Sequence, residues 1–123
     1  MSIDATISDS GIRRLPVGDR FVETDSEGYL RRLDDWSEDF ARAQAESEGL
    51  TLTDAHWQIV RFLRSWFHEH GVQAQVRVMI RHFSEAWGPE RGSNHALHDL
   101  FPNGGPQKQG NRIAGLLRTK GEH

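Results

Sequence analysis

Histidines are the side chains with the widest chemical repertoire here, because the chain has seven of them and no cysteine. His95 and His98 are three residues apart on one predicted helix, whereas His68 and His70 are two apart and lie on different helix faces. No third ligand follows at a spacing typical of a metal site. Gly104-Gly105-Pro106 lacks the Lys-Ser/Thr that completes a phosphate loop. We therefore predict no metal, no cofactor and no nucleotide-binding motif.

The C-terminal segment Arg112–His123 reads Arg-Ile-Ala-Gly-Leu-Leu-Arg-Thr-Lys-Gly-Glu-His. Other distinctive segments precede it in the chain: Glu23-Thr24-Asp25-Ser26-Glu27-Gly28-Tyr29-Leu30, Trp36-Ser37-Glu38, Glu48-Gly49-Leu50-Thr51-Leu52-Thr53, His56-Trp57, Arg61-Phe62-Leu63-Arg64, and Leu100-Phe101-Pro102 with Gly105-Pro106 and Gln109. In this order they resemble the DsrC/TusE sulfur-relay family, which includes the gamma subunit of dissimilatory sulfite reductase. The resemblance runs from about residue 20 to the C-terminus.

The family's arm reads roughly Lys/Arg-Ile-Ala-Gly-Leu-Pro-x-Pro-x-x-Cys-x, and its penultimate cysteine carries sulfur as a persulfide. In this sequence Glu122 occupies that position, and Asn111 stands where two-cysteine members place a second cysteine. Leu117 and Thr119 replace the two prolines, so the arm loses two fixed φ angles and should sample more conformations. Sulfur relay needs a thiolate. We therefore expect no catalytic residue and no carrier function.

The resemblance implies docking without sulfur transfer. We expect a cysteine-less, non-enzymatic protein that modulates sulfur metabolism by binding sulfite reductase or sulfurtransferases, with an arm over residues 115–123. An alternative that the family name implies is a sulfurtransferase for tRNA 2-thiouridine synthesis, which the missing cysteine opposes. The residues expected to contact a partner are Arg112, Gly115, Leu116, Arg118, Lys120, Glu122 and His123.

A second hypothesis is a DNA-binding regulator of sulfur genes. Predicted helices over residues 54–70 and 74–87, separated at Gly71, could form a helix-turn-helix. The second would present Gln73, Gln75, Arg77 and Arg81, whose side-chain types can read base edges. The same residues could instead face an acidic protein partner. Residues 51–123 carry nine Lys and Arg against six Asp and Glu, a net +3, whereas residues 1–50 carry −6 from six Arg and twelve acids.

The elements that must position these residues follow from periodicity and caps. Residues 1–17 are predicted to be a flexible lead, and residues 20–23 and 29–31 are predicted to form a β-hairpin. Ser37 and Thr53 are expected to cap helices over about 38–48 and 54–70. Further helices are predicted over 74–87, from Ser93 to Pro102, and over 107–114.

The expected fold is mainly α, a single domain over residues 18–123. By the resemblance, it is an orthogonal helical bundle with a helix-turn-helix-like pair, an N-terminal β-hairpin and an extended C-terminal arm. Aromatic residues at helical spacing are expected to form the core, namely Trp57, Phe62, Trp66, Phe83 and Trp87. No apolar run is long enough for a membrane span and no signal peptide is visible, so cytoplasm is the expected location.

Overall fold

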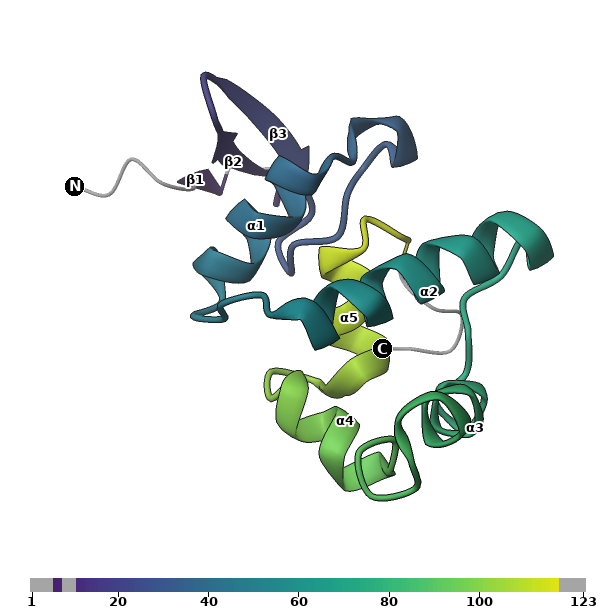
Figure 1. Cartoon of the computed structure of the whole chain (residues 1–123). Coiled ribbons are helices and arrows are strands. Elements are labelled where there is room, and N and C mark those ends of the chain that lie inside the picture. Colours follow the sequence, from purple (N-terminus) through teal and green to yellow (C-terminus); the bar gives the residue numbers. More distant parts are fainter. Residues whose placement is uncertain (1–5, 8–10, 118–123) are drawn as a thin grey trace.

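The computed structural model describes residues 6–7 and 11–117 of the chain. It is mainly helical, with a small N-terminal sheet (Figure 1). The elements in chain order are β1 (Thr6–Ile7), β2 (Arg13–Val17), β3 (Arg20–Thr24), the 3-10 turn η1 (Leu33–Asp35), α1 (Glu38–Ser47), α2 (Asp54–His70), α3 (Val76–Trp87), α4 (Asn94–Leu100) and α5 (Gly105–Ile113). The predicted mainly α fold with an N-terminal β-hairpin is thereby confirmed, whereas residues 118–123 of the predicted extended arm lie outside the described residues.

One strand of the hairpin, β3, is the predicted segment 20–23, but its partner is not the predicted segment 29–31. β3 pairs antiparallel with β2, with Leu15 opposite Val22, and the sheet order is β1-β2-β3. Residues 13–17, predicted to belong to a flexible lead, are therefore a strand. Within the described residues, β1 pairs with β2 only at Arg13 and Arg14, so no described residue of β1 requires the N–H that Pro16 lacks.

The segment that was predicted to be the second strand folds instead as a loop around Asp25. One carboxylate oxygen, Oδ1, accepts hydrogen bonds from the backbone N–H groups of Glu27, Gly28 and Tyr29 at 2.9–3.0 Å. Only an isolated bridge joins Thr24 to Leu30. The local hydrogen bonds of Asp25 thus replace a ladder of strand pairing.

The helix boundaries agree well with the capping signals. The hydroxyl oxygen of Ser37 accepts a hydrogen bond from the N–H of Phe40, and α2 covers the predicted residues 54–70. At the start of α2, the backbone N–H of Thr53 donates to Nδ1 of His56, whose Nε2 contacts the carbonyl of Leu100 at 2.6 Å. Because the Leu100 carbonyl can only accept, Nε2 carries the proton and Nδ1 is the acceptor.

Two apolar clusters hold the elements together. The smaller joins the sheet to α1, with Leu15, Val17 and Val22 packed against Phe40. The larger lies among the helices, with α5 running behind α2, between α1 with the sheet and α3 with α4 (Figure 1). Of the five aromatic residues expected in the core, Phe83 is fully buried, whereas Trp57, Phe62, Trp66 and Trp87 are half-buried around it.

Helix α5 is the most deeply buried helix, although its sequence is largely polar. Seven of its nine residues are buried. Gly110 permits the close approach of α2, since a Cβ there would lie 2.9 Å from Cδ1 of Leu63. This helix leads directly into the C-terminal arm, so the core fixes the point from which the arm starts.

Candidate arm-root site

The root of the arm, residues 113–117, is held by a glycine cap at the end of α5. The N–H of Leu116 donates to the carbonyl of Asn111 at 3.0 Å, and the N–H of Gly115 donates to the carbonyl of Arg112 at 3.2 Å. This pair of bonds is a Schellman motif, which requires a left-handed residue after the helix. Gly115 supplies it, with φ at 72°.

Side chains from two other elements bind the remaining carbonyls of the arm root. The indole Nε1–H of Trp36 donates to the carbonyl of Ile113 at 2.9 Å, and Nη1 of Arg64 donates to the carbonyl of Ala114 at 2.8 Å. The guanidinium carbon of Arg64 lies 3.8 Å from the ring centre of Trp36. Stacking and hydrogen bonding therefore lock these two side chains together beneath the arm.

Gln73 continues this series of contacts beyond the helix. Its Nε2 donates to the carbonyl of Leu117 at 2.6 Å. Gly115 meanwhile lies so close to Trp36 that a Cβ at this position would overlap Cδ1 of the indole ring. Trp36, Arg64 and Gln73 thus hold the described end of the chain, residues 113–117, against the domain.

A buried polar cluster fixes α5 from its other side. Glu48, at the end of α1, receives the Nε and Nη2 of Arg112 at 3.2 and 2.8 Å, and both side chains are only 8% exposed. The amides of Gln44, Asn103 and Gln109 also donate to the Glu48 carboxylate. Charge and hydrogen bonds on both oxygens make the buried carboxylate tolerable.

The charge of Arg112 is stabilised in this environment. Burial alone would lower the pKa of Arg112, but hydrogen bonding and attraction to the Glu48 carboxylate, together with Tyr29, outweigh it and raise this pKa above its ordinary value. Nη2 of Arg112 also donates to the carbonyl of Asn103 at 2.6 Å. Arg112 therefore acts as a charged connection between α1, the 101–104 turn and α5.

The predicted partner-binding residues divide into two groups. Arg112, Gly115 and Leu116 are buried, so in this structure they secure the arm root inside the domain and face no partner. Arg118, Lys120, Glu122 and His123 lie outside the described residues. Asn111, at the second cysteine position of the family, is fully buried in the last turn of α5.

The predicted nucleic-acid surface is also divided. Gln75, Arg77 and Arg81 are exposed, but Gln73 is half-buried and its amide is engaged by Leu117. Gln73 thus belongs to the arm-root site. Among the described residues, no group of three or more His, Asp or Glu side chains could hold a metal ion, and no helix is long and apolar enough to span a membrane.

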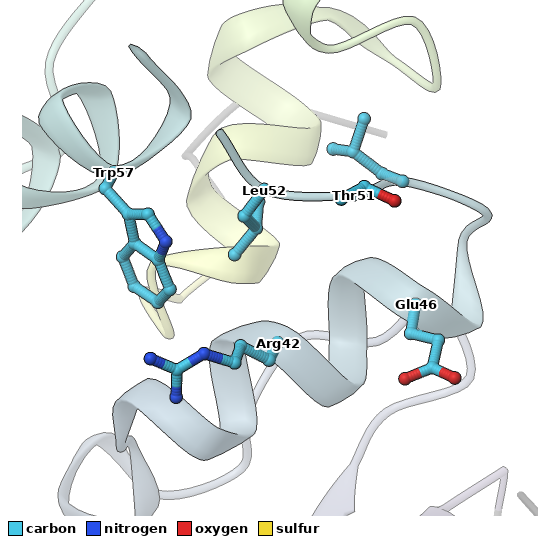
Figure 2. Close-up of a pocket in the computed structure, with 6 residues that line it drawn as sticks. Arg42, Glu46, Thr51, Leu52 and Trp57 are labelled. Carbon is cyan, nitrogen blue, oxygen red and sulfur yellow. The ribbon is translucent and has the colours of Figure 1, made fainter. Parts of the chain in front are cut away.

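Two clefts flank these elements. One, of about 360 Å³, lies between α1 and the start of α2 and is lined by Arg42, Glu46, Leu50, Thr51, Leu52 and Trp57 (Figure 2). The other, of about 400 Å³, lies at the arm root and is lined by Leu33, Asp34, Arg64, Phe67, His68, Gly71 and Leu116. We call the second one the arm-root cleft.

Sequence reasoning missed the residues that build this site. Trp36, Glu48 and Arg64 each lie in a segment that resembles the family, but nothing in their local pattern showed that all three converge on α5. Their partners are 77, 64 and 50 positions away in the chain. These residues could have been found only by expecting that the segments that resemble the family pack around the arm.

Comparisons with known proteins agree with this architecture. The family model described as "DsrC like protein" matches residues 16–121. Sulfurtransferase TusE of Yersinia pseudotuberculosis is 42% identical over 97 residues, which cover 79% of this chain and 89% of the relative. The oxidized gamma subunit of dissimilatory sulfite reductase (DsrC) from Archaeoglobus fulgidus has a TM-score of 0.81 and 33% identity, over 88% of this chain and 97% of that one.

Allochromatium vinosum DsrC gives a TM-score of 0.77 with 37% identity, over 88% of this chain and 96% of that chain. The family match over residues 16–121 includes β3, the helices α1 to α5 and the side chains that hold the arm root. Its extent and identity leave no other assignment of the fold. The chain belongs to the DsrC/TusE sulfur-relay family, and it does so without a single cysteine.

Proposed function

We propose that this protein is a non-catalytic member of the DsrC/TusE family that acts by binding sulfite reductase or the sulfurtransferases of a sulfur relay, and does not carry sulfur itself. The observation that carries the proposal is the absence of cysteine from a chain that otherwise matches the family over residues 16–121. Without a thiolate, no persulfide can form or be exchanged.

The arm-root geometry supports a binding role. The Schellman cap, Trp36, Arg64 and Gln73 all hold the chain where it leaves the domain. A fixed starting point lowers the entropy that the arm loses when a partner binds it. The protein would then occupy the docking site of a true carrier and modulate the flow of sulfur by competition.

The direct test is a binding measurement with purified dissimilatory sulfite reductase lacking its own gamma subunit, and with a purified sulfurtransferase of the relay. We expect the full chain to bind at least one of them and to displace a cysteine-containing carrier. Calorimetric titrations that detect no binding to either protein, at concentrations where the carrier binds, would sink the proposal.

DNA binding, the second hypothesis, gains no support from the comparisons or from the site. Of its four residues, Gln73 is committed to the arm root. Arg77 and Arg81 are exposed on α3. No observation favours DNA over a protein partner, and we do not propose it.

A further inference from the structure

The arm-root cleft combines an exposed apolar rim with a cation. Of the described residues, the large apolar side chains classed as exposed are Phe21, Leu33, Val72 and Leu117. Leu33 lines the cleft, while Val72 and Leu117 directly follow two of its lining residues, Gly71 and Leu116. One exposed apolar residue thus lines the cleft, and two others are chain neighbours of residues that line it. Such grouping marks interaction sites more often than scattered surface residues do.

Arg64 provides the charge at this opening. Its guanidinium stacks on Trp36 and uses Nη1 to bind the Ala114 carbonyl, which fixes its position. The described residues place no carboxylate in ion-pair contact with it, although Asp34 lines the same cleft. Partial burial lowers the pKa of Arg64. A half-buried cation with donors to spare favours an incoming carboxylate.

His68 is a further side chain of α2 that lines the cleft. It lies one helical turn after Arg64 on α2, and both side chains line the cleft. Residues four apart on a helix share one face. At about 400 Å³, the cleft is large enough for one side chain and its neighbour, within the range of ordinary ligand sites.

From this geometry we infer that the arm-root cleft is a docking site for a partner-protein segment in which an apolar side chain adjoins an Asp or Glu carboxylate. The apolar side chain packs against Leu33, and the carboxylate pairs with Arg64. This inference rests on the proposed function and names the chemistry of the partner. The cleft adjoins the arm root, because Leu116 lines it.

The first experiment compares variants of the full chain in calorimetric titrations with the partner protein that binds the wild type. The double variant Leu33→Ser/Val72→Ser should bind at least about tenfold more weakly, because it removes the exposed apolar residue that lines the cleft and the one that follows its lining residue Gly71. The matched control is Phe21→Ser, which removes an equally exposed apolar side chain from β3 and should bind like the wild type. Equal affinity of the double variant and the wild type would overturn the cleft assignment and leave the proposed function standing.

The second experiment does not need the partner. The ¹⁵N-labelled full chain is titrated with two hexapeptides that differ only in carrying Leu-Glu or Leu-Gln. The Leu-Glu peptide should shift the Arg64 Nε–H and Trp36 Nε1–H resonances, and the Leu-Gln peptide should shift them far less. No difference between the peptides would overturn the carboxylate pairing, whether or not any partner protein binds.

The chain's own Glu122 is the competing occupant, because it follows Leu117 by five residues. In the absence of peptide, Glu122→Gln should leave the Arg64 Nε–H resonance unchanged. A large shift of that resonance would show that Glu122 already pairs with Arg64. The occupant of the cleft would then be the chain's own C-terminal segment and no partner protein.

Discussion

At the scale of single residues, Arg112 is an arginine that was expected to contact a partner but is buried in the structure. The family resemblance predicts that Arg112 contacts a partner. In the structure it forms a bidentate ion pair with the buried Glu48. Removing one partner of such a pair leaves a buried charge uncompensated, which costs far more than the pair itself contributes.

Glu48→Gln should therefore lower the free energy of unfolding by roughly 3 kcal/mol. The matched control is Glu38→Gln, which disrupts the exposed pair with Arg42 and should cost no more than about 0.5 kcal/mol. Urea unfolding followed by tryptophan fluorescence measures both. Equal effects of the two substitutions would contradict the assignment of Glu48 as the centre of the polar cluster.

Gly115 and Gly49 end two helices with the same cap but different surroundings. Both have positive φ, at 72° and 76°, but only at Gly115 would a Cβ meet another side chain, that of Trp36. Gly49→Ala should cost about 1 kcal/mol from the left-handed backbone alone. Gly115→Ala adds the steric overlap and should cost about 3 kcal/mol. If thermal and urea unfolding give the same loss for both, the packing of Trp36 against the arm root is looser than the structure shows.

At the scale of elements, α5 with its arm root is the unit on which the proposed function rests. Its sequence is largely polar, yet it lies at the centre of the helices with seven buried residues. Glycine makes this possible, since Gly110 admits Leu63 of α2 at close range. Because α5 is fixed within the core, the position of the residues that directly follow it is fixed as well.

Gln73 should stabilise the end of the arm root through its hydrogen bond to Leu117. Gln73→Ala removes the hydrogen bond to Leu117, so the amide of Leu116, bonded to Asn111, should exchange with solvent several-fold faster. Global stability should change by less than about 1 kcal/mol. Gln75→Ala, two residues later and exposed, is the control and should leave the exchange rate unchanged. Unaltered exchange in Gln73→Ala would show that the Leu117 contact does not hold the arm.

At the scale of the whole molecule, the chain retains a carrier's scaffold without a carrier's thiol. Incubation with a persulfidated donor protein should give no added mass of about 32 Da on the wild-type chain. Glu122→Cys should restore the family's acceptor and gain that mass. Asn111→Cys is the matched control: its position is fully buried, so it should react far more slowly. Intact-mass spectrometry reads all three, and a stable adduct on the wild type would contradict the non-carrier proposal.

Much of the helical framework could be predicted because helix ends are encoded locally. Ser37, Thr53 and Gly71 mark their boundaries within one turn of the chain, and the structure confirms them. The pairing of the hairpin was harder to predict, because Phe21 and Val22 favour a strand but do not determine which segment pairs with it. Pairing depended on Leu15 and Val17, which share a buried face with Phe40 on α1.

The sequence by itself determined that this protein has no sulfur-accepting thiol and that α1 and α2 begin at their caps, because both facts depend on residue identity and near neighbours. Tertiary structure alone decided that Arg112 faces Glu48, that Trp36 and Arg64 bind the carbonyls at the arm root, and that Gln73 holds Leu117. A polar side chain's partner depends on which distant segment the fold brings within 3 Å of it. No local pattern contains that information.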